Sequence, residues 1–197
     1  MIDHLLIENS TKYTEQKIQS ALEITKGLYV VTEFLEPSLL NRLLCYCKQE
    51  NLVWAPELDP KGQIHLPSLN TRAKLNFIAE SPIEETHIVI ESLTETLNIL
   101  FSRKNKFNGI TIWKDVEGYK INQHTDNPII DFALQVYLTE NMKFGTKFFI
   151  DIGELQLYNN KNLCYLMDNT CKIRHSFDSE FNKNFPRYSL YASWSKE

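Results

Sequence analysis

The sequence has few of the residues that mark flexible linkers and low-complexity segments. Six of its 197 residues are glycine and seven are proline, and no segment repeats at a fixed period. With 43% hydrophobic residues, the chain can bury a core and falls within the size range of one ordinary domain. We therefore expect a single domain over residues 1–197.

An excess of basic residues is also missing. Lys and Arg number 21 against 25 Asp and Glu, which gives a formal net charge of -4. Because nucleic-acid binding needs a basic face that releases counterions, this balance argues against nucleic acid as a partner. No stretch is apolar for long enough to cross a bilayer, and the N-terminus lacks the basic start and apolar run of a signal peptide. We expect a soluble, cytoplasmic protein without membrane contacts. The sequence does not indicate its oligomeric state.

Several catalytic and metal-binding motifs are absent as well. The sequence has no Gly-rich phosphate loop, no Gly-x-Ser-x-Gly elbow and no His-Glu-x-x-His motif, so hydrolase and kinase functions lack the residues they need. The four cysteines, at positions 45, 47, 164 and 171, do not have the two-residue gap of a zinc knuckle or a thioredoxin-type site. We expect them to be reduced and mostly buried; the alternative is a disulfide or a thiolate metal site.

Hydrophobic spacing predicts helices in the first half of the chain. Residues 13–25 carry apolar side chains at helical spacing and are expected to form an amphipathic helix that Gly27 stops. A β-branched and aromatic run at 28–34 predicts a strand, and Pro37 opens a second helix. A third helix is expected over residues 83–101.

Residues 53–75 lose this period and are punctuated by proline and glycine, which predicts a long loop or a loose hairpin. Long irregular segments in compact domains are often lids, so the segment is a candidate substrate cover; an ordinary surface excursion is the alternative. His65 and Arg72 within this segment are candidate substrate contacts; the alternative is that both are solvated loop residues.

Beyond Phe107 the pattern changes to short strands separated by turn residues. Eight strands are predicted, at residues 110–113, 119–124, 131–138, 147–150, 155–157, 163–167, 173–176 and 188–194. Strands of this kind behind a helical first third predict a mainly β fold with flanking helices: a double-stranded β-helix, or jelly roll, braced by N-terminal helices. Residues 1–106 would then supply the support and residues 107–197 the catalytic half.

His124 and Asp126 are the first candidates for chemistry. In an extended segment, residues two apart point to the same side, so the imidazole and the carboxylate can converge on one metal ion. His175 lies about fifty residues later, at the end of a predicted strand. Two histidines and one aspartate on one face of an octahedral iron leave the opposite face open, which oxygen activation requires. A hydrogen-bonded core or surface histidine is the alternative for His175.

Arg187 stands at the start of the last predicted strand. There an arginine is usually a solvated edge charge, but inside a barrel its guanidinium could grip a carboxylate through two parallel hydrogen bonds. Ser189, two residues later, would face the same way and could add a hydroxyl donor.

The order His-x-Asp, then His, then Arg-x-Ser resembles the Fe(II)- and 2-oxoglutarate-dependent dioxygenases. The likeness is closest to the prolyl-hydroxylase-like branch and covers about residues 107–195. It runs through the segments GYKINQHTDNP (118–128), VYL (136–138) and GTKF (145–148).

The resemblance implies a role for each candidate. It makes His124, Asp126 and His175 the iron ligands and Arg187 the partner of the distal carboxylate of 2-oxoglutarate. Tyr137 matches a tyrosine that, in some members, donates a hydrogen bond to the same carboxylate; a core aromatic is the alternative.

Two further positions depart from the family pattern. Trp113 stands where relatives often have a tyrosine that touches the cosubstrate, and Tyr119 is a candidate to take that part instead. Gly145 stands where relatives often have two glycines, whereas this chain has Phe144-Gly145.

The implied cofactors are Fe(II), 2-oxoglutarate as cosubstrate and dioxygen, with ascorbate as a further candidate. The implied reaction is hydroxylation of a peptidyl proline, an amino acid or a small molecule, with release of succinate and carbon dioxide. Because Asp126 is a carboxylate, and not the small residue of the halogenating relatives, hydroxylation is favoured over halogenation.

Three alternatives stay open. The first is a nucleobase demethylase of the same superfamily, but that branch has a second arginine six residues after the first, and this chain has Ser193 there. The second is a non-catalytic jelly-roll binding module with an accidental triad. The third is a cupin-type metalloenzyme that uses iron without 2-oxoglutarate.

Overall fold

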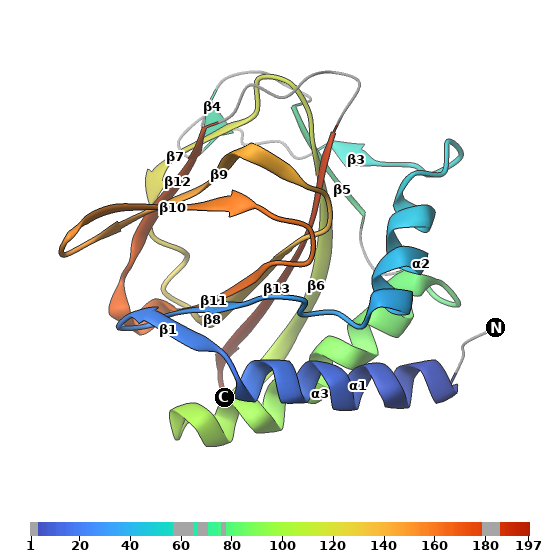
Figure 1. Ribbon diagram of the computed structural model, residues 1–197, viewed down its shortest axis with the longest axis horizontal. Helices are drawn as coiled ribbons and strands as arrows, with labels where there is room; N and C mark the ends of the chain where they lie inside the picture. Colours follow the sequence, from blue (N-terminus) through green and yellow to red (C-terminus); the bar gives the residue numbers. More distant parts are fainter. Residues whose placement is uncertain (1–3, 57–64, 67–70, 76–77, 179–185) are drawn as a thin grey trace.

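The computed structural model describes residues 4–56, 65–66, 71–75, 78–178 and 186–197, which form two antiparallel β-sheets flanked by helices (Figure 1). The large sheet contains, in spatial order, β1 (Leu22–Thr25), β2 (Leu28–Val31), β11 (Cys164–Asp168), β8 (Ile130–Tyr137), β13 (Arg187–Lys196), β6 (Asn105–Asp115), β5 (Arg72–Leu75) and β3 (Ala55–Pro56). The smaller sheet contains, in spatial order, β10 (Gly153–Asn159), β9 (Asn141–Ile150), β12 (Arg174–Asp178), β7 (Lys120–His124) and β4 (His65–Leu66).

The prediction of a jelly roll braced by helices is confirmed. All eight strands expected in the second half are present as β6 to β13, and the chain passes repeatedly from one sheet to the other between them. β7, β9, β10 and β12 lie in the smaller sheet, and β6, β8, β11 and β13 lie in the large one. Residues distant in the sequence therefore become neighbours across and between the sheets.

The helix predicted at residues 13–25 was wrong at both ends. The helix is α1 (His4–Gln19), and residues 22–25 form β1, which pairs with β2. The buried stripe of α1 contains Ser10, Thr14 and Ile18, so hydrophobicity marked its face poorly. Gly27 stands at the hairpin turn between β1 and β2 with φ +84°, a conformation that glycine adopts without strain.

The segment at 53–75 contains more regular structure than its composition predicted. β3 pairs with β5 at the edge of the large sheet, and β4 pairs with β7 in the smaller sheet. Residues 57–64 and 67–70, where much of the candidate lid falls, lie outside the described residues. A lid stays a prediction.

The other helices begin where their capping residues stand. In α2 (Pro37–Cys47), the Glu36 carboxylate accepts hydrogen bonds from two backbone amides of the first turn, and in α3 (Pro82–Phe101), Ser81 does so for one. The Trp194 indole on β13 donates a 2.9 Å hydrogen bond to Thr94 on α3, which ties that helix to the large sheet. Nowhere in the described part does a helix combine the length and the apolar character needed to cross a membrane.

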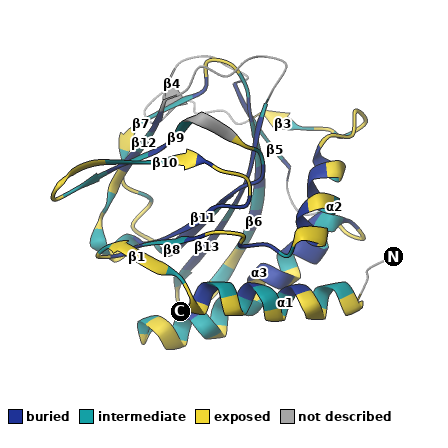
Figure 2. Ribbon diagram, viewed as in Figure 1, coloured by how far each residue is buried: buried dark blue, intermediate teal, exposed yellow. Residues whose placement is uncertain are grey.

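β8 separates two hydrophobic clusters, since successive side chains of a strand point to opposite faces. Phe132, Leu134 and Val136 join the main core between the helices and the large sheet, and Ala133 and Tyr137 join a smaller cluster between the sheets. Figure 2 shows the buried residues concentrated on the helix faces turned toward the sheet and along the central strands. The space for a site is thus on the face of the large sheet opposite the helices.

The four cysteines differ in exposure. Cys47 and Cys164 are buried, and burial raises the pKa of the Cys47 thiol to about 12. Cys45 is exposed and Cys171 is half-buried. The expectation that most cysteines are buried therefore holds for two of the four.

A bidentate ion pair joins the end of α3 to the end of β11. Both Arg103 terminal nitrogens lie 2.8 Å from the Asp168 carboxylate, which also accepts hydrogen bonds from the Thr170 amide and hydroxyl. Burial acts to raise the pKa of Asp168, but these hydrogen bonds outweigh it and hold the pKa below its ordinary value.

We predict that Asp168→Asn lowers the free energy of unfolding by about 1 kcal/mol at neutral pH. Since the pKa of the folded carboxyl is depressed, its contribution is present above about pH 4 and is lost as pH falls through the folded-state pKa. Chemical denaturation over a pH series would measure this difference. Asp151→Asn, the same change at an exposed position, is the control, and a pH-independent difference for Asp168→Asn would contradict the interpretation.

Candidate active site

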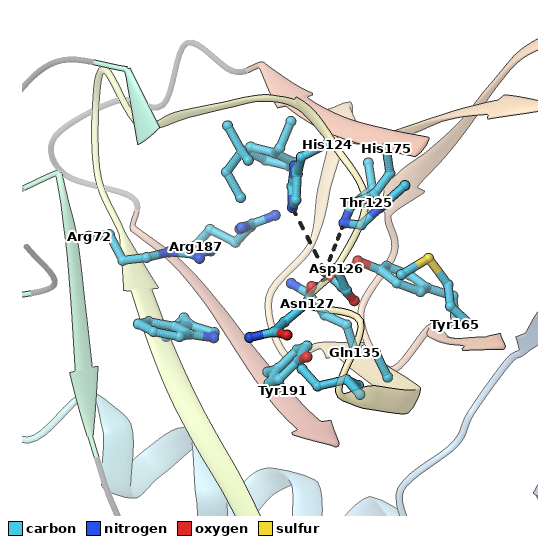
Figure 3. A pocket seen from close by; sticks show the side chains of 17 residues that line it. Arg72, His124, Thr125, Asp126, Asn127, Gln135, Tyr165, His175, Arg187 and Tyr191 are labelled. Atoms are coloured by element: carbon cyan, nitrogen blue, oxygen red, sulfur yellow. Dashed lines mark hydrogen bonds and ion pairs between the residues drawn. The ribbon is translucent and has the colours of Figure 1, made fainter. Parts of the chain in front are cut away.

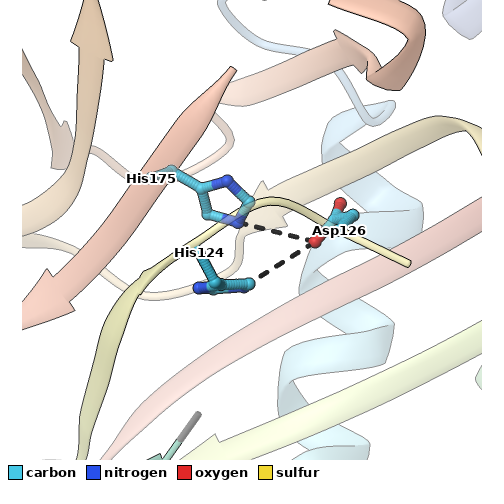
Figure 4. Close-up of side chains that lie close together, drawn as sticks. All are labelled: His124, Asp126 and His175. Carbon is cyan, nitrogen blue, oxygen red and sulfur yellow. Dashed lines mark ion pairs between the residues drawn. The ribbon is translucent and has the colours of Figure 1, made fainter. Parts of the chain in front are cut away.

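Two histidines stand side by side on adjacent strands of the smaller sheet. His124 is the last residue of β7 and stands directly opposite His175 on β12. Asp126 follows β7 by two residues, and its Oδ1 lies 3.8 Å from His124 Nε2 and 3.6 Å from His175 Nε2 (Figure 4). One ligand atom from each residue lies within 4.8 Å of the others, so these three side chains could hold one metal ion.

The backbone orients both imidazole rings. His124 Nδ1 lies 2.8 Å from the carbonyl oxygen of Asn122, and His175 Nδ1 lies 3.4 Å from that of Ile173. Protons on these Nδ1 atoms leave the Nε2 lone pairs for a ligand, the arrangement usual for metal-binding histidines. Burial is the main cause that lowers the pKa of His175, so the neutral form needed for metal binding prevails at neutral pH.

A second group of charged side chains forms a row across three adjacent strands. Asp115 at the end of β6 stands opposite Arg187 on β13 and opposite Arg72 on β5. Arg72 Nε lies 2.6 Å from Asp115 Oδ1 and its Nη2 lies 3.2 Å from Oδ2. Arg187 donates to Asp115 Oδ2 from Nε at 2.8 Å and also from Nη2. One carboxylate thus receives two guanidiniums.

This row is buried, and its one carboxylate offsets one of its two positive charges. Asp115 is 0% exposed, Arg187 2% and Arg72 9%. Burial acts to raise the pKa of Asp115, but the two arginines outweigh it and hold the pKa below its ordinary value. With the carboxyl ionised, the three side chains together carry a net charge of about +1.

Aromatic rings fix the planes of both guanidiniums. The Arg187 guanidinium carbon lies 3.7 Å from the Phe177 ring centroid. That of Arg72 lies 4.4 Å from the Trp113 centroid and 4.1 Å from the Tyr119 centroid. Such stacking leaves the guanidinium edges available for hydrogen bonds.

Both groups face one cavity of about 400 Å³. Figure 3 shows the two arginines on one side of it and His124, Asp126 and His175 on the other. The rest of the lining is mostly apolar, aromatic or uncharged polar: Trp113, Ile121, Thr125, Asn127, Ile130, Ala133, Gln135, Thr146, Tyr165, Met167, Phe177 and Tyr191. A cavity with a metal-binding group at one end and a cation at the other suits a ligand that both chelates and carries a carboxylate.

The other three candidate residues, Tyr137, Ser189 and Tyr119, are not among those that line the cavity. The Tyr137 hydroxyl donates a 2.7 Å hydrogen bond to Thr146 Oγ1, and it is Thr146 that lines the cavity. Ser189 is fully buried opposite Tyr137, and among the described residues its Oγ has no hydrogen-bond partner. Tyr119 is fully buried beneath Arg72 and is not among the lining residues, whereas Trp113 is. Cosubstrate contacts by Ser189, Tyr137 and Tyr119 stay predictions.

Asp115 is not among the residues that the sequence singles out, and Arg72 has a different environment from the one expected for an irregular loop. Arg72 is buried on a strand of the large sheet and is not a solvated loop residue. An acidic residue just after a predicted strand is usually a surface charge, so nothing in the sequence marks Asp115 as a residue of the site. Only the pairing of β5 with β6, which an irregular segment conceals, puts the two side by side.

No protein-family model matches the sequence, and no curated protein sequence does. Solved structures with a similar fold include a prolyl-4-hydroxylase from Pseudomonas putida, with TM-score 0.69 and 13% identity over 95% of this chain and 98% of that one. A prolyl hydroxylase from Trichoplax adhaerens, in complex with a hypoxia-inducible-factor peptide fragment, has TM-score 0.66 and 12% identity over 100% and 94%. HygX from Streptomyces hygroscopicus, with nickel, 2-oxoglutarate and hygromycin B bound, has TM-score 0.62 and 7% identity over 86% and 83%. The chain therefore has the fold of the 2-oxoglutarate- and iron-dependent oxygenases.

We predict that the chain binds one divalent metal ion through the three clustered side chains. Removal of one ligand in His175→Ala should weaken nickel(II) binding by more than the roughly tenfold to hundredfold effect of losing an outer-shell partner. Titration calorimetry on the full chain would measure it. His4→Ala, at an exposed helix position, is the control, and equal nickel affinity for the two variants would exclude a metal site here.

Proposed function

We propose that this protein is an Fe(II)- and 2-oxoglutarate-dependent oxygenase that hydroxylates a peptide, an amino acid or a small molecule and releases succinate and carbon dioxide. The observation that carries the proposal is that a His124–Asp126–His175 group and the buried Arg187 share one cavity. A cluster of two histidines and an aspartate, or a buried arginine, can each have a purely structural role. Together in one cavity they match the two ends of 2-oxoglutarate, namely the keto acid that chelates a metal ion and the distal carboxylate.

The residues present fit such a metal. Two imidazole nitrogens and one carboxylate oxygen on one side of an octahedral ion are the ligand set of non-haem Fe(II) oxygenases and leave the other positions open. When bound, iron together with 2-oxoglutarate supplies the activation of dioxygen and the oxidative decarboxylation that drive hydroxylation. Backbone carbonyls orient both imidazoles, and burial favours the neutral form of His175. Asn169 Nδ2 lies 3.5 Å from Asp126 Oδ2, whereas Asp126 Oδ1 is the oxygen near the two histidines.

Arg187 would bind the distal carboxylate of the cosubstrate. In a buried cavity a charge-assisted pair is stronger than in water, because little solvent screens it. Phe177 stacks on the guanidinium and Asp115 holds two of its nitrogens, so little reorganisation is needed when a carboxylate enters. Thr146, which accepts a hydrogen bond from Tyr137, also lines this cavity.

The substrate classes proposed rest on the ligands of structurally similar proteins. One of these binds a peptide fragment and another binds hygromycin B, a small molecule. A nucleobase demethylase is less well supported, because Ser193 stands at the position of that branch's second arginine. Its Oγ accepts a 3.2 Å hydrogen bond from Asn108, and the residue is not among those that line the cavity.

The test is succinate formation by the full chain with Fe(II), 2-oxoglutarate and oxygen. The panel should contain proline peptides, free amino acids, small metabolites and alkylated nucleotides. We expect one class to raise succinate release above the rate without substrate, with one hydroxylated product per succinate. No succinate with any class, together with no 2-oxoglutarate binding, would favour the non-catalytic binding module.

We predict that Arg187→Met raises the KM for 2-oxoglutarate roughly tenfold or more, because a charge-assisted bidentate pair is lost. Steady-state succinate assays over a 2-oxoglutarate series would measure it. Lys106→Met, the loss of an exposed cation on β6, should leave the KM unchanged. An unchanged KM in Arg187→Met would show that Arg187 does not bind the distal carboxylate; product formation that does not depend on 2-oxoglutarate would instead favour the cupin-type alternative.

A further inference from the structure

Arg187 does not face the cavity as a free cation, because Asp115 already binds it. If these two residues were alone, the pair would be neutral and would attract an anion only weakly. Arg72 changes this balance, since it binds the same carboxylate from the other side and restores one positive charge. The number of charges in this row, and not Arg187 alone, sets how strongly the wall attracts an anion.

The geometry is consistent with a rigid arrangement of all three residues. They occupy one row across β5, β6 and β13, so the backbone ladder fixes their spacing. Each arginine uses its Nε and Nη2 on Asp115, which fixes the rotation of both guanidinium planes. Both arginines also line the cavity.

Resting on the function proposed above, we propose that Arg72, Asp115 and Arg187 form one carboxylate seat with a net charge of +1. Asp115 is its positioning residue, and Arg72 supplies the second cation. The seat takes a single carboxylate group, that of a dicarboxylate whose other end lies at the metal-binding residues. Without Asp115, two guanidiniums would face each other in a buried site; without Arg72, the remaining pair would be neutral.

This proposal makes a charge-rescue prediction. Arg72→Met keeps an apolar chain against Trp113 and Tyr119 but brings the net charge of the row to zero. It should weaken 2-oxoglutarate binding roughly tenfold or more. The double variant Arg72→Met/Asp115→Asn returns the net charge to +1 and should recover a large part of that loss, and Arg72→Lys should retain most of the affinity.

The measurement is titration calorimetry on the full chain loaded with nickel(II), so that binding is read without turnover. The probes are 2-oxoglutarate and pyruvate, which keeps the chelating keto acid but lacks the distal carboxylate. Loss of affinity for 2-oxoglutarate with unchanged affinity for pyruvate places the effect at the arginine end. Thermal unfolding of each variant checks that it is folded, and Asp115→Asn alone is left out because it leaves two buried cations facing each other.

The outcomes separate this inference from the function on which it rests. If the wild type binds no 2-oxoglutarate, both fail. If the wild type binds it and Arg72→Met binds it equally well, the oxygenase proposal stands and the seat is wrong. A double variant as weak as Arg72→Met would also overturn the seat, because Arg72 would then have only a structural role. An equal loss of affinity for pyruvate would also overturn the seat, because it would place the effect at the metal-binding residues.

Discussion

The pairing of one buried carboxylate with two guanidiniums is the interaction on which the arginine side of this cavity depends. A single buried charge costs several kcal/mol even after relaxation, and it persists only where opposite charges and hydrogen bonds offset the loss of water. Asp115 alone or Arg187 alone would be such a charge. Together with Arg72 they use two hydrogen bonds from each arginine, and this requires β5, β6 and β13 to keep their register. The edge of the large sheet and the wall of the cavity are therefore fixed by the same contacts.

The metal-binding side depends on register in a different way. His124 and His175 are brought opposite each other because β12 pairs with β7, and a shift of one residue would turn one imidazole to the other face of the sheet. Asp126 lies just past the end of β7, where the chain is no longer paired and the carboxylate can turn toward both rings. The two ends of the cavity are thus built on separate sheets, and sheet packing sets the distance between them.

The sequence predicts those features of the fold and site that depend on local interactions. Strand alternation is local, so the strands of the jelly-roll half could be read from the period of two. His124 and Asp126 do converge as expected, but Asp126 reaches His124 from the unpaired segment after β7 and not from the strand itself. The role of Asp115 could not, because it depends on a partner in β5, within a segment that has no hydrophobic period. The helix predicted at 13–25 began too late because the buried stripe of α1 includes Ser10 and Thr14, whose polarity hides the face that packs. It ended too late because Leu22 and Ile24, which fit the helical spacing, belong to β1.

Charge balance across the cavity offers a physical basis for selecting the cosubstrate. On the proposed function, a divalent ion with Asp126 and two neutral imidazoles has a charge of about +1, and the row at Arg187 adds about +1. A dianion such as 2-oxoglutarate neutralises both ends. A keto acid with one carboxylate leaves one positive charge buried, and a larger polyanion leaves an excess negative charge, each of which is unfavourable in a cavity with largely apolar walls. Because Asp115 cancels one of the two arginine charges, the same row that seats a carboxylate also limits how many it can take.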